Sequence, residues 1–267
     1  MGNLYAKEMK RNLKRFLIWV GATAALILFT LALVPTMTKS AETVRAYLDV
    51  FPEVFRKAFG IDFDTWSNVL GIYVTYFVFY DLVMGGIFSI YLAMDILAKE
   101  ENRKSADFLL ARPITRVGVV GGKALAHLSY VFLFNLGATL TGYIGMEIFK
   151  TSPYPAGPYF ILCTYGFLFT LLFGGLGFFI SILVKRGRSM TGAGIGVVLA
   201  CYFIDALSKA VEKAEGIGYI SPFRFVDIEV LSPDYGFTWW RLLYLIGVPA
   251  LFFALTFAVY RRKDILT

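Results

Sequence analysis

Residues 16–34 read FLIWVGATAALILFTLALV, a run without a charged residue that follows five basic residues between Lys7 and Arg15. An α-helix needs about 20 predominantly apolar residues to cross the hydrocarbon core of a bilayer. A cleaved signal peptide is the alternative near an N-terminus, but its apolar region is only about 7–15 residues long. We therefore predict a retained membrane-spanning helix over Phe16–Val34.

Further stretches of the chain have a similar length and apolar character. They are Ile72–Leu97, Ala124–Phe149, Tyr159–Val184, Met190–Leu207 and Trp239–Tyr260. Hydrophobic residues make up 58% of the chain and charged residues 17%, whereas soluble domains contain about 45–50% and about 25%. This composition excludes a water-soluble enzyme, a disordered chain and a disulfide scaffold. The sequence predicts an all-α integral membrane protein, a single transmembrane domain over residues 1–267 with six transmembrane helices.

The basic residues indicate which way these helices face. Most of the 26 Lys and Arg residues lie in the N-terminal segment, the loop 98–123, the turn 185–189 and the C-terminal tail. Fewer lie in the loops 40–68 and 208–238. Because positively charged loops stay in the cytoplasm, both termini are predicted to be cytoplasmic. The net charge of +7 is therefore assigned to orientation in a plasma membrane and not to nucleic-acid binding.

Residues 1–15 have the pattern of an amphipathic helix. Apolar residues recur on one face at helical spacing, at Tyr5, Met9, Leu13 and Phe16. Basic residues fill most of the remaining positions. This pattern is typical of a helix that lies in the membrane interface with its cations near anionic lipid headgroups. We predict an interfacial elbow helix directly before the first span.

Two longer loops fall on the outer side by the charge count. The segment 40–68 has an apolar pattern close to helical spacing, and 208–238, the predicted extracellular loop, contains a short charged stretch followed by Gly and Pro residues. Both are predicted to lie on the membrane surface or to cap the helices. The tryptophans cluster toward the span ends, as interfacial anchors do: Trp19, Trp66, Trp239 and Trp240.

Residue patterns for catalysis are missing from the sequence. It contains no Gly-x-x-x-x-Gly-Lys-Ser/Thr phosphate loop, and the glycines of 192–196 open an apolar span, where they favour close helix packing. His127 is the only histidine, so it is interpreted as a polar residue bonded within the bundle and not as a metal ligand. Cys163 and Cys201 lie in apolar runs, which argues against a disulfide framework and fits a prokaryotic protein.

Asp81 is the carboxylate of most interest, because ionisable residues inside a membrane are costly and often functional. It lies near the middle of the second predicted span, whereas Asp95 lies near the cytoplasmic end, where it can face headgroups. With Tyr76 and Tyr80, Asp81 is a candidate for a translocation path. The alternatives are a hydrogen bond from Asp81 to a Tyr or Thr of another helix, and helix packing for the tyrosines. Glu147 and Asp205, at span ends, are expected to be solvated.

The loop 98–123 reads AKEENRKSADFLLARPITRVGVVGGK. Charges of both signs flank a small apolar face at Leu109 and Leu110, and Pro113 ends the helix. The pattern predicts a short amphipathic helix just below the membrane. A positive-inside connector with incidental helicity is the alternative.

With its acidic pair, the Leu-Leu-x-x-Pro-x-Thr-Arg core and Gly122-Lys123, this loop resembles that of ABC-2 type (type V, exporter-like) ABC transporter permeases. Lys104-Ser105 departs mildly from the family pattern. The resemblance implies a coupling helix that docks into a separate ATPase, two ATPase copies per transporter, and a second permease, identical or a paralogue. It implies ATP and magnesium in that partner and no cofactor in this chain. The implied coupling residues are Glu100, Glu101, Arg103, Lys104, Asp107, Leu109, Leu110, Arg112, Pro113 and Arg116.

Two rival functions remain at this point. A secondary transporter would use Asp81 to couple an ion gradient, but no repeated half or pair of matching broken helices is evident. A membrane enzyme or scaffold is the second rival, and clustered catalytic residues that would favour an enzyme are missing. The sequence favours a permease subunit of an ATP-driven exporter, without its own enzymatic activity, and does not indicate the cargo.

Overall fold

The computed structural model describes all residues except 1, 40, 60–62, 103–115, 184–189 and 263–267. Within the described residues, six helical segments are long and apolar enough to cross a membrane, as predicted. They are α1 (Gly2–Met37), the continuous run α5 (Val69–Phe77), η1 (Val78–Val83) and α6 (Met84–Asn102), α8 (Arg116–Phe149), α9 (Ala156–Leu183), α10 (Met190–Ala210) and α11 (Trp239–Arg262).

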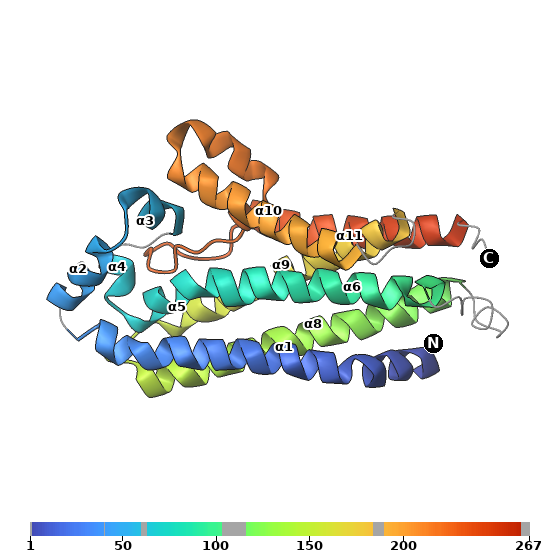
Figure 1. Ribbon diagram of the computed structural model, residues 1–267, viewed down its shortest axis with the longest axis horizontal. Coiled ribbons are helices and arrows are strands. Elements are labelled where there is room, and N and C mark those ends of the chain that lie inside the picture. Colours follow the sequence, from blue (N-terminus) through green and yellow to red (C-terminus); the bar gives the residue numbers. More distant parts are fainter. Residues whose placement is uncertain (1, 40, 60–62, 103–115, 184–189, 263–267) are drawn as a thin grey trace.

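The long helices run side by side, and both chain termini lie at the same end of the bundle (Figure 1). We call this the termini end and the opposite one the distal end. The last turn of α6 and the first turn of α8 also lie at the termini end, so the segment 103–115 is bracketed there. This arrangement agrees with the even number of helices that the sequence predicts.

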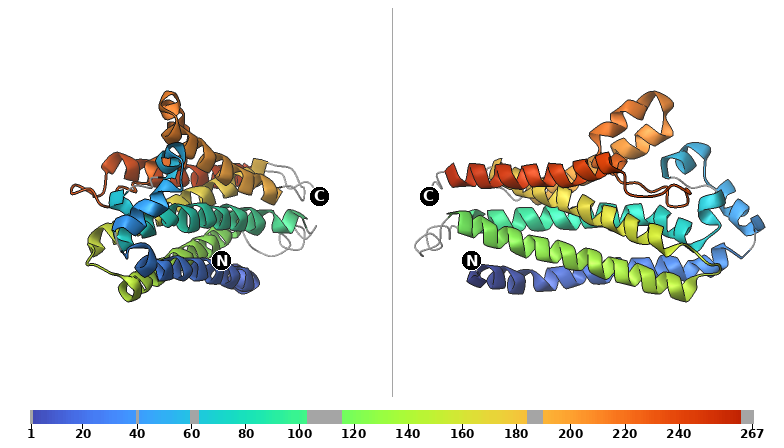
Figure 2. Two further views of the ribbon diagram at one scale, coloured as in Figure 1. Left: turned by 60° about the vertical axis from the view of Figure 1, so that its left-hand side comes forward. Right: turned by 180° about the vertical axis from the view of Figure 1, so that it is seen from behind.

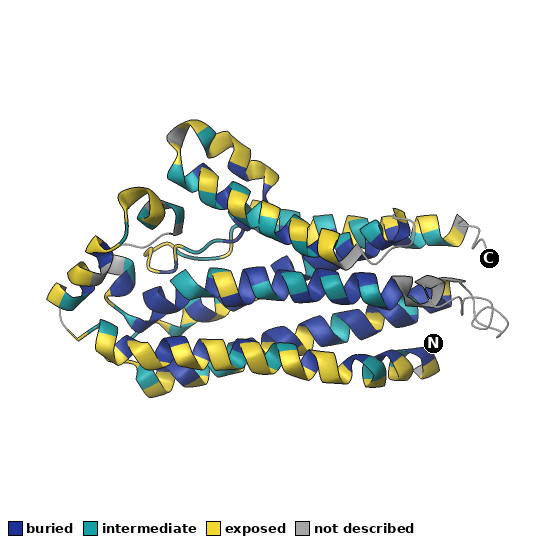
Figure 3. Cartoon of the chain, viewed as in Figure 1, coloured by how far each residue is buried: buried dark blue, intermediate teal, exposed yellow. Residues whose placement is uncertain are grey.

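Packing divides the helices into a core and a periphery. Helix α6 packs on α9, α1 lies along α8, and α11 lies along α9 (Figure 2). The most apolar part of the second span is 72% buried, but the corresponding part of α11 is only 17% buried. Figure 3 shows the same contrast between α6, which is largely buried, and the outward face of α1. The exposed apolar faces of α1, α10 and α11 are therefore available to lipid or to another subunit.

The N-terminal residues do not form a separate elbow helix in the structure. Gly2–Met37 is one continuous helix. Its buried stripe near the N-terminus is Leu4, Glu8, Asn12 and Phe16, whereas Leu13, predicted to be on the apolar face, is 47% exposed. The predicted stripe was displaced because α8 packs along this segment, so the rotation of the helix is determined by protein contacts instead of by a lipid surface.

Short helices close the distal end, as expected for the segment 40–68. They are α2 (Ala41–Asp49), α3 (Glu53–Phe59) and α4 (Phe63–Trp66). Val44 and Leu48 are buried against the core. Trp66 is also buried and donates a hydrogen bond to Thr75 Oγ1 at 3.1 Å. The interpretation of Trp66 as an interfacial anchor is therefore wrong, because its indole N–H finds a partner inside the protein.

The segment after α10 folds back along α10 through η2 (Glu212–Ile220), and η3 (Pro222–Phe225) follows before α11 begins. Ser221 accepts a hydrogen bond from the Phe223 N–H and donates one to the Cys201 carbonyl at 2.7 Å. Phe223 is buried and packs on Phe169, with ring centroids 4.7 Å apart. These contacts hold the segment against α9 and α10 and position the start of α11.

Glycines of α9 allow close helix approach. A Cβ added at Gly174 would lie 2.2 Å from His127 Cε1, and one at Gly177 would lie 2.8 Å from the Ile90 carbonyl oxygen. In α10 the same test finds a close neighbour at Gly194 but nothing within 4 Å of Gly192 or Gly196. The predicted packing role thus holds for α9 and for one of the three α10 glycines.

Gly174→Ala is expected to destabilise the protein, because the new methyl group would displace the imidazole of His127. Overpacking of this kind costs about 1–3 kcal/mol. Gly196→Ala is the matched control, since it adds the same methyl group in open space on a helix. The measurement is the thermal unfolding midpoint of the purified protein in detergent. Equal midpoints for the two variants would contradict the packing role of Gly174.

Candidate functional site

The implied coupling residues fall mostly outside the described part of the chain. Arg103, Lys104, Asp107, Leu109, Leu110, Arg112 and Pro113 all lie in the segment 103–115. Glu100 and Glu101 belong to the last turns of α6, and Arg116 begins α8. The coupling helix therefore remains a prediction, and the structure describes the helices on either side of it.

A buried polar cluster connects those two helices to α1 at the termini end. We call it the Glu8 cluster; it consists of Glu8, Arg11, Asn12 and Lys123. The Lys123 ammonium lies 3.8 Å from Glu8 Oε1, and it donates a hydrogen bond to the Ile96 carbonyl of α6. Asn12 donates to Glu8 Oε2 at 3.2 Å, and Arg11 pairs with Glu8 Oε1. Three helices thus meet at one ion pair.

The charges of the Glu8 cluster are removed from solvent. The Lys123 and Glu8 side chains are 1% and 0% exposed. A buried charge that loses its partner is strongly unfavourable, so such pairs persist only with additional hydrogen bonds. Asn12 and the Ile96 carbonyl supply those bonds here. The cluster therefore fixes the positions of α1, α6 and α8 relative to one another.

Additional contacts between the N-terminal part of α1 and the neighbouring helices surround the cluster. Arg15 pairs with Asp95 of α6 at 2.8 Å, so Asp95, which is 24% exposed, has a protein partner. Tyr130 of α8 donates to the Met9 carbonyl. The N-terminal third of α1 is thus bonded to the end of α6 and the beginning of α8, the two elements that bracket the predicted coupling helix.

Sequence reasoning missed the Glu8 cluster. Glu8 and Lys123 are far apart in the sequence, and the residue patterns indicate a role only for Lys123, as one of the basic residues of the loop 98–123. One signal was present: Glu8 is the only acidic residue among residues 4–16. An isolated carboxylate in a basic stretch indicates a buried partner when it shares a helix face with apolar residues, as Glu8 does with Leu4 and Phe16.

Asp81 lies in the second candidate span, in η1, a π-helical segment between α5 and α6. Its side chain is buried, and Tyr73 Oη donates to Asp81 Oδ2 at 3.3 Å. The partner is a tyrosine of the same span, eight residues earlier, and not one of another helix as predicted. The Tyr73 ring makes an edge contact with Tyr159 of α9 at 5.2 Å. The carboxylate is thereby connected to the neighbouring helix through an aromatic pair.

The tyrosines proposed for a translocation path differ in their surroundings. Tyr80 is buried and donates to the Tyr73 carbonyl at 3.2 Å. Tyr76 is half-buried and stacks on Trp66, with ring centroids 6.5 Å apart. Tyr80 therefore lies with Asp81 and Tyr73 in one polar cluster, which we call the Asp81 cluster. Tyr76 instead contacts Trp66 of α4 at the distal end. Both sets of contacts fit the packing alternative, and a role in translocation stays a prediction.

Asp81→Leu is expected to lower stability by about 1–3 kcal/mol, because it leaves the buried Tyr73 hydroxyl without its acceptor. Asp81→Asn keeps an acceptor oxygen and is expected to stay near wild type in stability and in transport. Tyr73→Phe is the matched control, because it removes the hydroxyl donor. Combined with Asp81→Leu, it is expected to recover stability, since no buried hydroxyl is then left without an acceptor. Loss of transport in Asp81→Asn, with assembly intact, would instead support ion coupling through this carboxylate.

Three other polar residues in the spans or at their ends have protein partners. His127 Nε2 lies 3.1 Å from the Ser89 carbonyl and 3.2 Å from Ser89 Oγ, which confirms its predicted role within the bundle. Glu147 is exposed and pairs with Lys150, as expected at a span end. Asp205 was expected to be solvated but is buried and pairs with Lys209 at 2.7 Å, because the η2 segment folds back beside it.

The described residues contain no group of three or more His, Cys, Asp or Glu side chains that could hold a metal ion. A family model described as ABC-2 family transporter protein matches residues 2–265 of the chain. The chain belongs to the ABC-2 transporter family. No curated relative matches it.

Membership assigns the chain as a transmembrane component of an ABC transporter, a permease type that lacks an ATPase domain of its own. The family match covers the Glu8 cluster, the Asp81 cluster and the loop between α6 and α8 alike. In this ABC-2 permease, the Glu8 cluster joins α1, α6 and α8. It therefore lies directly beside the loop that, according to the sequence resemblance, is expected to dock on the ATPase.

Proposed function

We propose that this ABC-2 permease is the membrane-spanning subunit of an ATP-driven exporter and that its loop 98–123 docks on a separate ATPase subunit. The observation that carries the proposal is the Glu8 cluster. It bonds both helices that bracket the loop to α1, so a displacement of the loop is transmitted to three spans together. A loop that served only as a connector would not require a buried ion pair at its base.

The contacts of the Glu8 cluster support a specific way in which ATP binding in the partner moves the spans. ATP binding closes the partner ATPase dimer and shifts the docked loop. Because Ile96 and Lys123 are bonded to each other, α6 and α8 move as a unit with α1. Packed elements of this kind exchange between discrete arrangements, and ATP shifts the population from an inward-facing to an outward-facing state. The permease itself contributes no hydrolysis.

A second permease, identical or a paralogue, completes the transporter in this proposal. The exposed apolar faces of α1, α10 and α11 offer surfaces for a second permease as well as for lipid. Figure 3 shows exposed residues along the outward side of α1 and α10. Each permease binds one ATPase, which accounts for two ATPase copies per complex.

The proposal is tested by expressing the full chain together with a P-loop ATPase encoded by a neighbouring reading frame. We expect the two proteins to co-purify in detergent, and we expect the ATPase activity in the complex to be inhibited by vanadate. A permease that purifies without any ATPase, and does not alter the hydrolysis rate of the added ATPase, would contradict the proposal.

The orientation is tested by labelling single cysteines in intact cells, in a background without Cys163 and Cys201. Lys104→Cys and Arg188→Cys are expected to be protected from a membrane-impermeant thiol reagent, because both positions lie on the predicted cytoplasmic side. Glu53→Cys and Glu229→Cys, which are exposed at the other side, are expected to react. Labelling of Lys104→Cys from outside would reverse the orientation and exclude docking of the loop on a cytoplasmic ATPase.

A further inference from the structure

The N-terminal part of α1 carries five basic residues, which the structure divides into two groups. Arg11 and Arg15 form ion pairs within the protein, with Glu8 and with Asp95. The other three are lysines with exposed side chains: Lys7, Lys10 and Lys14. None of these lysines forms an ion pair with a residue in the described ranges of the chain. The described carboxylates therefore leave three positive charges of α1 uncompensated.

The three lysines lie on one face of α1, and we call this face the lysine stripe. Residues three and four apart are neighbours on a helix surface, and positions 7, 10 and 14 follow this spacing. The buried stripe of the same segment, which includes Leu4 and Glu8, lies roughly opposite at 3.6 residues per turn. Because α8 packs along the buried stripe, the lysine stripe points away from α8.

The face that carries the lysine stripe becomes apolar one turn further along. Leu17 and Ile18 follow Lys14 by three and four residues, and they are 57% and 61% exposed. Both belong to the first candidate span. A Cβ added at Gly21, which continues the same spacing, would have nothing within 4 Å, so no described segment covers this face. The lysine stripe therefore begins where an uncovered apolar surface of the span ends.

The distance of the lysines from this apolar surface suits the lipid headgroups. At 1.5 Å per residue, Lys14, Lys10 and Lys7 lie about 4, 10 and 15 Å from Leu17 along the helix axis. The headgroup layer is about 5–8 Å thick on each side of the hydrocarbon core, and a lysine extends its ammonium toward it along an apolar stem. Lys14 and Lys10 thus reach the headgroups directly, and Lys7 lies within the Debye length of about 8–10 Å.

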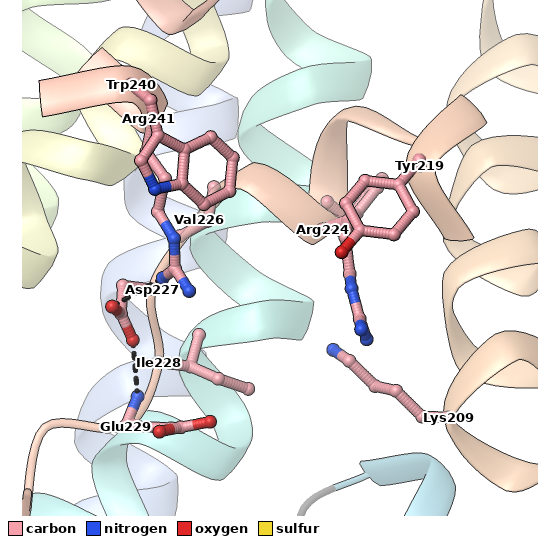
Figure 4. Close-up of a pocket in the computed structure, with 10 residues that line it drawn as sticks. Lys209, Tyr219, Arg224, Val226, Asp227, Ile228, Glu229, Trp240 and Arg241 are labelled. Carbon is pink, nitrogen blue, oxygen red and sulfur yellow. Dashed lines mark hydrogen bonds and ion pairs between the residues drawn. The ribbon is translucent and has the colours of Figure 1, made fainter. Parts of the chain in front are cut away.

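A group of cations at the start of α11 shows the contrast with the lysine stripe. A pocket there is lined by Lys209, Arg224 and Arg241 (Figure 4). Each of them pairs with a carboxylate, in the same order Asp205, Glu215 and Asp227. Glu229 adds a further carboxylate to the lining. That pocket therefore has no excess of positive charge, whereas the lysine stripe has one.

We infer that the lysine stripe, Lys7, Lys10 and Lys14, is a docking surface for the headgroups of anionic phospholipids. Basic residues directly beside a span attract anionic lipid, and each contributes about a fivefold gain in affinity. A second copy of this chain on the same face would bring two lysine stripes together, so charge complementarity favours lipid there. The helix does not lie flat in the interface, as the sequence predicted, but offers one face to the headgroups. The inference does not depend on the ATPase, so it is tested with the permease alone.

The experiment measures lipid binding to the purified full chain by native mass spectrometry, with phosphatidylglycerol and phosphatidylcholine as probes. The Lys7→Gln/Lys10→Gln/Lys14→Gln variant is expected to bind phosphatidylglycerol about 100-fold more weakly, because three charges that attract the headgroup are lost. Its affinity for phosphatidylcholine is expected to stay within about threefold of wild type. Lys7→Arg/Lys10→Arg/Lys14→Arg keeps the three charges and is expected to retain phosphatidylglycerol binding within the same range.

The matched control is Lys39→Gln/Lys150→Gln/Lys213→Gln, which removes three exposed lysines outside the lysine stripe. It lowers the net charge by the same amount and is expected to bind phosphatidylglycerol within about threefold of wild type. An equal loss of binding in this control would overturn the inference, because binding would then follow net charge alone. Equal phosphatidylglycerol binding by the wild type and the Lys7→Gln/Lys10→Gln/Lys14→Gln variant, with an unchanged thermal unfolding midpoint, would overturn it as well. Loss of ATPase co-purification in that variant, with lipid binding unchanged, would assign the lysine stripe to the ATPase instead.

Discussion

Lys123→Met is expected to lower the thermal unfolding midpoint of the purified permease by about 10 °C. The substitution removes the buried ammonium from beside the Glu8 carboxylate, which keeps Arg11 as a charged partner. Breaking a buried pair costs about 3–5 kcal/mol, and the remaining pair with Arg11 places the expected cost at the lower end of that range. It also removes the hydrogen bond from Lys123 to the Ile96 carbonyl. Helix α6 and helix α8 then lose this polar contact at the base of the loop, so coupling of the partner's ATP hydrolysis to the permease is expected to weaken.

The matched control is Lys150→Met, because Lys150 pairs with Glu147 where both side chains are 40% exposed. An exposed pair contributes about 0–1 kcal/mol, so this variant is expected to stay near wild type. Glu8→Gln combined with Lys123→Met is expected to recover part of the lost stability, since the buried carboxylate that lost its ammonium partner becomes a neutral amide, and Arg11 is 22% exposed and so keeps contact with water. If Lys123→Met were as stable as Lys150→Met, the Glu8 cluster would not hold the three helices.

Reversing the acidic pair at the start of the loop, Glu100→Lys with Glu101→Lys, is expected to abolish co-purification of the ATPase. Like charges placed at an interface cost several kcal/mol, which corresponds to a loss of affinity of about a hundredfold or more. The permease itself is expected to insert and fold, because these positions lie at the end of α6 and outside its apolar span. The measurement is the amount of ATPase retained on an affinity-tagged permease.

The other cytoplasmic turn provides the control for this reversal. Lys185→Glu with Arg186→Glu also changes two charges on the same predicted side, but the turn is too short to form a docking helix. We expect it to reduce ATPase binding less. Unchanged assembly and hydrolysis in the Glu100→Lys/Glu101→Lys variant would leave the loop 98–123 as a positive-inside connector. Lys123→Met differs from this variant, because it is expected to disrupt coupling while docking is retained.

The sequence by itself determined the fold class and the number of spans. In lipid, a backbone must satisfy its hydrogen bonds internally, so each apolar stretch of about 20 residues becomes a helix whatever surrounds it. For the same reason the span limits were accurate to a few residues in most helices. The role of His127 could also be predicted, because a single imidazole inside a helix bundle needs a hydrogen-bond partner. In the structure that partner is Ser89.

The tertiary structure alone decided which polar residues meet. Periodicity placed Glu8 on a basic helix but could not show that α8 covers that face, and so missed the pair with Lys123. Trp66 and Asp205 were assigned to the membrane surface, yet both are buried because loop segments fold back over them. Such contacts depend on the rotation of each helix about its axis and on the path of the loops, and both are set by packing between segments distant in the sequence.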